Sequence, residues 1–451
     1  MSFEVMAPLM FVGLIVFLLL GYPVAFSLGA VGLLFGWIGM HYDFIQPVFL
    51  QNIPLRIFDT LKNQTLLAIP FFTFMGLILE RSGMAEDLLD TVGQLFGRLR
   101  GGIAYAVILV GALLGATTGV VAASVIAMGL ISLPVMLRYG YSPRVASGVI
   151  AASGTLAQIV PPSLVLIIMA DQLGVSVGDM YRGALVPSLI LTGLYLVYVI
   201  GVSLINPKAA PGLPEEARTY RGVRLVMRVL TVMIPPLVLI FLVLGTIFIG
   251  VATPTEGGAM GAVGALVLAA LRRRLSLKVL LQAMESTARI TSFVAFILVG
   301  SRIFSLVFVG VDGDRWVENL LSSTLPQNPL AFLLVLNLLV FLIAFFLDYF
   351  EIAFIVIPLI LPAVTGIMEQ LYPQDYKIGL YWFGVMLGVN LQTSFMHPPF
   401  GFALFYLRSV APPSLKTSDI YWGAIPYVVI QVVMVLIVLF NPWLVTNWIT
   451  K

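Results

Sequence analysis

The sequence predicts an all-α, polytopic membrane protein made of two inverted repeats. The first observation is composition: 60% of the 451 residues are hydrophobic and 10% are charged, whereas a soluble domain carries about 25% charged residues. The second is a set of apolar runs that are long enough to cross, or nearly cross, about 30 Å of hydrocarbon: Val229–Ile249, Leu330–Phe346 and Tyr427–Phe440. Backbone groups in lipid must pair within their own segment, so we expect these runs to be helices.

The distribution of lysine and arginine predicts the orientation, because basic loops remain in the cytoplasm. The basic segments are Arg98–Arg100, Arg138–Arg144, Lys208–Arg228 and Arg272–Lys278. Placing them inside puts the N-terminus, His41–Asp43, Asp171–Asp179, Thr253–Glu256 and Val311–Asp314 outside, and Arg302 within or near a membrane segment. The net charge of +3 is small and scattered, so we expect no nucleic-acid partner.

The apolar stretch Ile103–Leu137 has basic residues at both ends. It therefore forms either two closely spaced spans or a hairpin that enters from the cytoplasm, turns at Gly115–Ser124 and leaves on the same side. The centre of this stretch, Gly-Ala-Thr-Thr-Gly, is small and polar. Irregular backbone at membrane depth is tolerated only where it lines a cavity, which favours the re-entrant hairpin.

The same order of features occurs twice along the chain. The corner Gly21–Pro23 recurs as Gly250–Glu256, the hairpin recurs as Leu330–Thr365 with a polar interruption at Asp348–Glu351, and the double-proline segment Gly154–Ser163 recurs as Asn390–Gly401. We therefore expect a first repeat over 1–205, which contains a hairpin over 103–137 and a broken helix over 146–169. A basic cytoplasmic linker over 206–228 follows. The second repeat, over 229–451, contains a hairpin over 330–365 that enters from the outer face and a broken helix over 379–406. Inverted repeats with paired discontinuous helices are typical of secondary transporters; the alternative is that Pro-Pro merely kinks two ordinary spans.

The double prolines indicate what the breaks bind. Proline lacks an N–H, so upstream carbonyls lose their helical partners, and such oxygens beside hydroxyl and amide side chains suit a hard cation such as Na⁺. The candidate Na⁺ ligands are Thr117, Gly154, Thr155, Val160, Asp348, Gln392, Thr393 and Met396, with Ser153, Gln158, Asn390 and Ser394 near them. Helix N-termini near Ser163 and Gly401 would present N–H groups to a carboxylate. The candidate substrate contacts are Thr118, Gly119, Ser124, Pro162, Ser163, Pro399 and Gly401.

Isolated charged residues in apolar surroundings are functional candidates because their desolvation is expensive. For Asp348 we favour cation binding or proton coupling, and the role of Glu351 stays open. Glu256 follows Pro254 at a helix start, so N-terminal capping competes with a transport role. For Arg302, a side chain that snorkels to the membrane interface or forms a structural ion pair is favoured over substrate contact. For His397, hydrogen-bonded packing is favoured over a functional role in titration.

Several motifs resemble the large membrane subunit of TRAP transporters, the DctM family, from about Pro8 to Trp443. They are Ala68-Ile-Pro-Phe-Phe-Thr-Phe-Met-Gly76 with Glu80-Arg-Ser-Gly83, Gly140-Tyr141, Ile159-Val-Pro-Pro-Ser163, Ala252-Thr-Pro-Thr-Glu256 and Pro398-Pro-Phe-Gly401. The resemblance implies an ion-transporter-superfamily fold that works as a Na⁺-driven elevator in the bacterial inner membrane, with sodium at the hairpin tips and following breaks. It also implies a separate four-helix (DctQ-type) membrane subunit, a periplasmic (DctP-type) binding protein and a small organic carboxylate as substrate. Many relatives read Ser-Gly-Ser at the first tip, where this chain reads Thr117-Thr-Gly-Val120.

Two other functions compete with this interpretation. A stand-alone carboxylate–sodium symporter of the same superfamily would need no binding protein. An intramembrane enzyme would need paired aspartates, a Ser/His pair or a His-Glu-x-x-His motif. The chain has no cysteine, and its two histidines, His41 and His397, lie in different halves and in no such motif, so we expect no enzyme.

Overall fold

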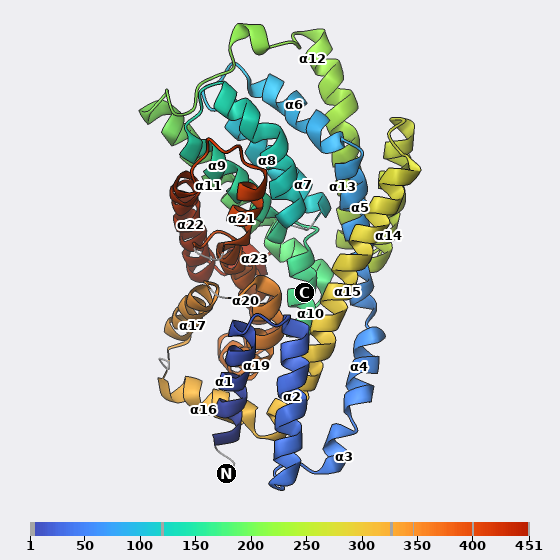
Figure 1. Ribbon diagram of the computed structural model, residues 1–451, viewed down its shortest axis with the longest axis vertical. Helices are drawn as coiled ribbons and strands as arrows, with labels where there is room; N and C mark the ends of the chain where they lie inside the picture. The colour runs from blue at the N-terminus through green and yellow to red at the C-terminus, as the bar shows by residue number, and fades with distance from the viewer. Residues whose placement is uncertain (1–4, 119–120, 325–327, 346, 399–400, 450–451) are drawn as a thin grey trace.

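The chain folds into helices, with no strand in the part described (Figure 1). The computed structural model describes residues 5–118, 121–324, 328–345, 347–398 and 401–449, with the backbone alone at 117–118, 318 and 321–324. Within these residues, eight helices are long and apolar enough to cross a membrane, or nine when the bent pair Pro47–Leu61 and Gln64–Arg81 is counted as one span. The prediction of an all-helical, multi-pass membrane protein is confirmed.

One group of helices contains the start of each half. α2 packs along α15, and α5 packs along both α14 and α15. Glycines permit the close approach of α2 and α15: a Cβ on Gly300 would lie 2.3 Å from the carbonyl oxygen of Ala25. The helices of this group are α1 (Met6–Leu19), α2 (Val24–His41), α3 (Pro47–Leu50), α4 (Ile53–Leu61), α5 (Ala68–Arg81), α13 (Ile234–Phe248), α14 (Pro254–Leu271) and α15 (Leu277–Gly310).

A second group contains the hairpins and the broken helices. α9 packs against α7, α8 and α22, while α20 packs against α10, α11 and α22. The helices of this group are α7 (Gly102–Thr118), α8 (Val121–Arg138), α9 (Pro143–Thr155), α10 (Leu164–Leu173), α11 (Val177–Ile205), α17 (Pro329–Ile343), α18 (Tyr349–Glu351), α19 (Ile357–Leu371), α20 (Tyr376–Leu391), α21 (Phe402–Val410), α22 (Thr417–Phe440) and α23 (Trp443–Thr446).

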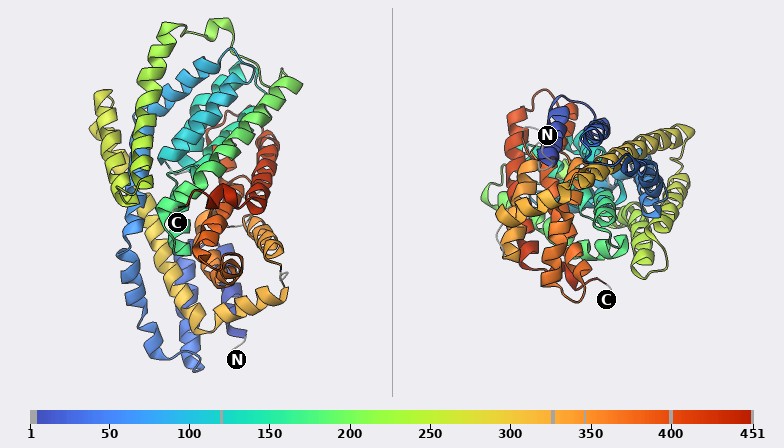
Figure 2. Two further views of the ribbon diagram at one scale, coloured as in Figure 1. Left: turned by 180° about the vertical axis from the view of Figure 1, so that it is seen from behind. Right: turned by 90° about the horizontal axis from the view of Figure 1, so that it is seen from below.

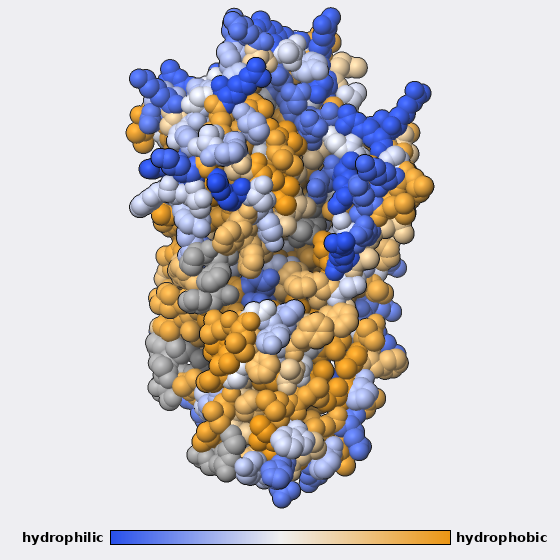
Figure 3. Space-filling view, viewed as in Figure 1, coloured by the Kyte–Doolittle hydropathy of each residue, from blue (hydrophilic) through white to orange (hydrophobic). Residues whose placement is uncertain are grey.

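Three further helices join the two groups: α6 (Met84–Phe96), α12 (Val223–Arg228) and α16 (Gly313–Thr324). α12 continues through a π-helical turn, Val229–Met233, into α13. Asp87 of α6 pairs with Arg272 at 3.6 Å and with Arg274 at 3.0 Å, and Asp90 pairs with Arg228 at 2.7 Å. Hydrophilic residues gather at this upper end of the molecule, whereas apolar residues cover much of the middle and lower part of the same face (Figure 3).

The two halves of the chain pack reciprocally. α2 of the first half lies on α15 of the second, and α14 of the second half lies on α5 of the first. In the same way, α22 lies on α9 and α11 lies on α20. The pair α1–α2 occupies the lower end of the molecule and the pair α13–α14 the upper end (Figures 1 and 2). Two halves related by an inverting twofold axis would produce this pattern.

Candidate functional site

The first hairpin consists of α7 and α8, and both of its ends meet one segment of the linker. The Gly101 amide donates to the carbonyl of Ala210 at 2.8 Å, and the Ser142 amide donates to that of Ala209 at 2.9 Å. The hairpin therefore starts and finishes on the same side of the molecule. The expected turn over Gly115–Ser124 is shorter than the sequence suggested, because α7 continues to Thr118 and α8 begins at Val121. The re-entrant position of this hairpin in a membrane stays a prediction.

The first broken helix comprises α9, a 3-10 turn over Leu156–Gln158, and α10. α10 starts at the predicted position, and Ser163 caps it: its hydroxyl accepts the Leu166 amide at 3.4 Å and donates to the Gln158 carbonyl. The hydroxyl of Tyr181 donates to the Ser163 carbonyl at 3.3 Å. Ser163 thus joins the two sides of the break, and its hydroxyl is already used within the chain.

The second broken helix repeats this arrangement. α20 passes into a 3-10 turn over Gln392–Phe395, and α21 begins after Gly401. The helix start expected near Gly401 is therefore present. A Cβ on Gly401 would lie 2.9 Å from the carbonyl oxygens of Phe395 and His397, so the absence of a side chain lets the backbone approach these two carbonyls.

The hydroxyls of the two candidate threonines donate the same kind of hydrogen bond. Thr155 donates to the Ala152 carbonyl at 2.8 Å, and Thr393 donates to the Asn390 carbonyl at 2.6 Å, each within its own helical turn. Both side chains are fully buried. A hydroxyl that donates its proton in this way still carries oxygen lone pairs that can bind a cation.

The second hairpin turns at a reciprocal cap formed by two carboxylates. Asp348 accepts the Glu351 amide at 2.9 Å, and Glu351 accepts the Asp348 amide at 3.0 Å. This capping box starts α18, which leads through a π-helical turn into α19. Asp348 therefore has a structural role at the break, whereas its role in cation binding stays a prediction. Glu351, whose role was open, is its capping partner.

The two broken helices cross where their breaks lie. A Cβ built on Gly388, one turn before the second break, would lie 3.3 Å from Ile159 and 3.4 Å from Leu166, on either side of the first break. Each break also lies against its own hairpin. A Cβ on Gly115 of α7 would lie 2.7 Å from the backbone of Ala157. The structure thus brings together the two segments that the sequence suggested as binding elements.

The predicted site residues are distributed as follows. Gly154, Thr155, Val160, Pro162 and Ser163 lie in the first broken helix and its break, Gln392, Thr393, Met396 and Gly401 lie in the second, Ser124 is buried in α8, and Asp348 caps α18. Gly119 and Pro399 lie outside the described residues, and for Thr117 and Thr118 only the backbone in α7 is described.

Two amide residues that the sequence analysis did not single out hold these breaks to neighbouring helices. Gln431 of α22 donates to the hydroxyls of Thr155 at 3.3 Å and Tyr195 at 2.8 Å. Asn390 before the second break donates to the carbonyl of Asn337 in α17 at 2.8 Å. Gln431 and Asn337 each stand alone inside a run treated as uniformly apolar. A lone amide in such a run was the signal that could have identified them.

Two of the three remaining candidates, Glu256 and Arg302, have structural partners. Glu256 forms a capping box with Thr253 at the start of α14, which confirms the capping interpretation. Arg302, on α15, interacts electrostatically with Asp171 at the end of α10. The ring of His397 is buried and stacks on Phe345, with the ring centroids 4.1 Å apart. The ring interacts with the backbone of Ala344, but the geometry falls short of a full hydrogen bond, so the hydrogen-bonded packing favoured for this histidine stays a prediction.

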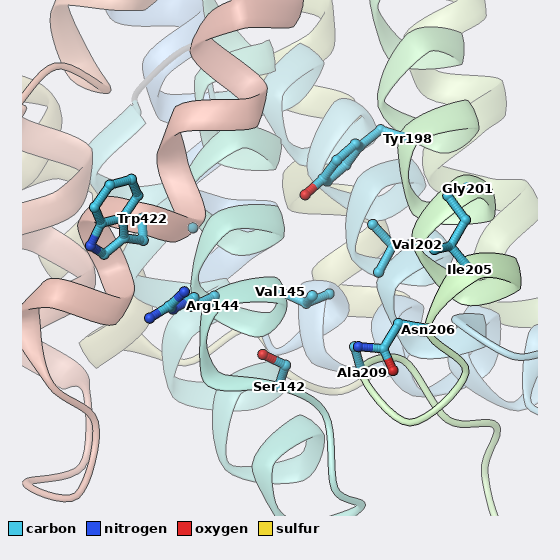
Figure 4. A pocket seen from close by; sticks show the side chains of 11 residues that line it. Ser142, Arg144, Val145, Tyr198, Gly201, Val202, Ile205, Asn206, Ala209 and Trp422 are labelled. Atoms are coloured by element: carbon cyan, nitrogen blue, oxygen red, sulfur yellow. The ribbon is translucent and has the colours of Figure 1, made fainter.

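Two cavities lie away from the crossing. One, of about 460 Å³, opens among α9, α11 and α22, where Trp422 and Arg144 face Tyr198 and Ile205 across the opening (Figure 4). Arg144 is paired with Asp419 at 3.2 Å. The other, of about 440 Å³, lies between α1 and the second hairpin, and Glu351 is the charged residue in its wall. Neither cavity is lined by the 3-10 turns of the breaks.

The sequence and the fold both match known proteins. The family model described as "Tripartite ATP-independent periplasmic transporter, DctM component" matches residues 11–444. The chain is 28% identical to the C4-dicarboxylate TRAP transporter large permease protein DctM of Vibrio cholerae, over 98% of this chain and 96% of that one. It is 26% identical to the 2,3-diketo-L-gulonate TRAP transporter large permease protein YiaN of Escherichia coli, over 98% of each chain.

A longer relative and a solved structure complete the comparison. The isethionate TRAP transporter permease protein DctMQ of Oleidesulfovibrio alaskensis is 26% identical over 96% of this chain, which spans 65% of that longer protein. Among solved structures, the YdaH transporter of Alcanivorax borkumensis has a similar fold, with a TM-score of 0.58 and 15% identity, over 89% of this chain and 90% of that one.

Proposed function

The chain belongs to the DctM family of tripartite ATP-independent periplasmic (TRAP) transporters, and from that premise we propose that it carries a small organic carboxylate into the cell in symport with Na⁺. Membership makes it a large permease subunit and excludes the intramembrane enzyme considered from the sequence. A multi-pass subunit of this kind works in the bacterial inner membrane.

The crossing of the two broken helices is the observation that carries this proposal. Discontinuous helices that meet within a membrane protein expose carbonyl oxygens and helix N-termini at one depth, as secondary transporters require. The short distance between Gly388, one turn before the second break, and the side chain of Ile159 in the first supports this proposal. An anionic substrate would bind at the N-termini of α10 and α21, which begin after Ser163 and Gly401.

The residues at the breaks fit a sodium ion. Oxygen donors are what a hard cation requires. The buried hydroxyl of Thr393 retains lone pairs for it, whereas the hydroxyl of Thr155 already accepts from Gln431 and keeps one. The amide oxygen of Gln392 is buried without a hydrogen-bond donor among the described residues. The carbonyls of Gly154, Val160 and Met396 and the carboxylate of Asp348 would complete the two sets of ligands. The bound cation supplies positive charge beside the substrate carboxylate.

The division of helices into two groups supports an elevator mechanism. In such a mechanism one group moves as a body with its bound substrate while the other remains fixed in the membrane. The helices α7–α11 and α17–α23 would move against α1–α5 and α13–α15. The reciprocal packing of the two halves provides the inverted repeat that lets the two end states resemble each other.

The partners follow from the family. TRAP systems comprise a DctM, a DctQ and a DctP component, and the Oleidesulfovibrio alaskensis relative joins the M and Q parts in one chain. We propose that this chain works with a separate four-helix DctQ-type subunit and a periplasmic DctP-type binding protein. The names of its relatives favour a C4-dicarboxylate or a similar organic anion as the substrate.

Reconstitution tests this proposal against the stand-alone symporter. The chain is placed in liposomes with its small subunit, and the binding protein is supplied outside with a labelled carboxylate that thermal-shift screening has shown it to bind. We expect uptake driven by an inward Na⁺ gradient and none with choline in place of Na⁺. Uptake by this chain alone, without the binding protein, would favour the symporter. Uptake that is independent of Na⁺ would contradict sodium coupling.

A further inference from the structure

Buried polar atoms without hydrogen-bond partners gather at the two breaks. Twelve buried side-chain nitrogen and oxygen atoms in the described part of the chain have no hydrogen-bond partner, and four of them belong to Gln158 and Gln392. The side chains of both glutamines are 0% exposed. Native proteins pair nearly all of their buried polar groups, so such a concentration indicates a place that a ligand completes.

The two glutamines lie at opposite ends of corresponding turns. Gln158 ends the 3-10 turn of the first broken helix, and Gln392 begins the 3-10 turn of the second. The two breaks adjoin each other, because Gly388 contacts Ile159, the residue that follows Gln158. Each turn also lies against a hairpin: Ala157 packs on α7, and Phe395 packs on Tyr349, with ring centroids 5.8 Å apart.

The chemistry of the amide identifies the ligand. An amide group offers an oxygen that accepts and an NH₂ that donates, and in both glutamines the nitrogen as well as the oxygen lacks a partner in the part of the chain that the structure describes. A sodium ion binds oxygen and would leave the NH₂ unsatisfied. A carboxylate only accepts hydrogen bonds and would leave the amide oxygen unsatisfied. A cation and a carboxylate bound side by side would satisfy both atoms.

We propose that the amides of Gln158 and Gln392 each bind sodium through Oε1 and the substrate through Nε2. This inference rests on the proposed function, to which it adds the residues that link cation and substrate. One amide stands at each broken helix, so the anion that satisfies both carries an acceptor group at each end, as a dicarboxylate does. Binding is cooperative, because either ligand orients the amide for the other.

Cooperativity of this kind has a reciprocal signature. If sodium increases the affinity for substrate by some factor, substrate must increase the affinity for sodium by the same factor. Loss of the linking amide reduces that factor toward one. A glutamine with a purely structural role would not change it, whatever its effect on stability.

The test uses this chain together with its small membrane subunit in nanodiscs. NaCl is titrated into choline chloride at constant ionic strength, with and without succinate, and the melting temperature is recorded. The variants are Gln158→Met and Gln392→Met, which keep the length of the side chain without the amide, and Gln158→Glu and Gln392→Glu, which keep an oxygen and lose the NH₂. The control is Gln94→Met, in α6, whose amide oxygen is also buried and unpaired but lies away from the breaks.

We expect the methionine variants to melt at or above the wild-type temperature in choline, because they remove an unpaired buried amide. They should need about tenfold more Na⁺ for half-maximal stabilisation, which is the effect of losing about 1.4 kcal/mol of binding free energy. In these variants succinate should no longer lower the Na⁺ concentration of half-maximal stabilisation. The glutamate variants should keep the Na⁺ response and lose the response to succinate. The Gln94→Met control should behave as the wild type does in both titrations.

Each other outcome contradicts a defined part of the argument. A wild type without a Na⁺ response contradicts sodium coupling itself, and a wild type that responds to Na⁺ but not to succinate overturns the dicarboxylate assignment. If the wild type responds to both ligands and the methionine variants do so with the same midpoints, the linking role is overturned while sodium coupling stands. Methionine variants that melt below the wild type in choline would also overturn the linking role, since the amides would then have hydrogen-bond partners within the protein. Glutamate variants that still respond to succinate would show that the NH₂ groups do not bind the substrate.

Discussion

The contact between α9 and α22 permits a prediction whose size follows from the geometry. A Cβ built on Gly148 of α9 would lie 2.1 Å from the carbonyl oxygen of Gly423 in α22, and a Cβ on Gly423 would lie 2.2 Å from that of Arg144. Ordinary contacts of a Cβ begin at 3.4 Å, so Gly148→Ala must move the two backbones apart by more than about 1 Å. Overpacking of this kind costs about 1–3 kcal/mol.

The alanine also raises helix propensity, by up to about 1 kcal/mol, and a matched variant measures that contribution. Gly193, in α11, has no atom within 4 Å of an added Cβ, so Gly193→Ala gains the propensity without the clash. We expect Gly148→Ala to melt about 1–3 °C below Gly193→Ala, measured by intrinsic fluorescence in one detergent. Small residues let membrane helices approach closely, and this pair holds the first broken helix against α22. Equal melting temperatures for the two variants would refute the close approach.

Three further perturbations address the hairpins and the caps. Asp348→Asn removes the charge but keeps an N-cap acceptor, which asparagine provides as well as aspartate does. We expect Na⁺-dependent uptake to be lost while the melting temperature stays unchanged. Unchanged uptake would remove Asp348 from the cation site. Thr253→Ala breaks the capping box of α14 and should lower the free energy of unfolding by about 1 kcal/mol, while uptake per folded molecule stays at the wild-type level. A loss of uptake without a loss of stability would instead give Glu256 a part in transport. Because the chain has no cysteine of its own, single cysteines introduced at Leu113 and Leu347 can be labelled with thiol reagents in membranes. An elevator mechanism predicts that the reagent reaches each cysteine from opposite faces in different states. Labelling of both cysteines from one face under every condition would contradict the elevator mechanism.

Much of the fold was predictable because its signals are local in the chain. Proline removes a backbone donor wherever it stands, so the breaks before Ser163 and Gly401 could be located from the sequence to within a residue or two. The Thr253–Glu256 cap was also predictable, since a capping box is formed by residues three apart. The Asp348–Glu351 cap has the same spacing, but the charge of Asp348 inside an apolar run drew the interpretation toward ion binding.

The contacts that complete the site were not predictable from the same signals. Thr155 is bound by Gln431, which lies 276 residues away, and Asn390 is bound by Asn337, 53 residues away. A soluble helix shows its buried side by its hydrophobic face, but a membrane helix is apolar on all sides. Its sequence therefore does not indicate which face meets lipid and which meets protein.

The sequence by itself determined that this chain is a multi-pass helical protein, where its helices break, and to which family it belongs. Composition, proline chemistry and short motifs carry that information in neighbouring residues. Only the tertiary structure decided that the two broken helices meet at Gly388 and Ile159, and that the buried amides of Gln158 and Gln392 find no hydrogen-bond partner among the described residues. The physical reason is that burial and pairing depend on how helices distant in the chain pack together, and that packing is set by the shapes of small and amide side chains across the interface.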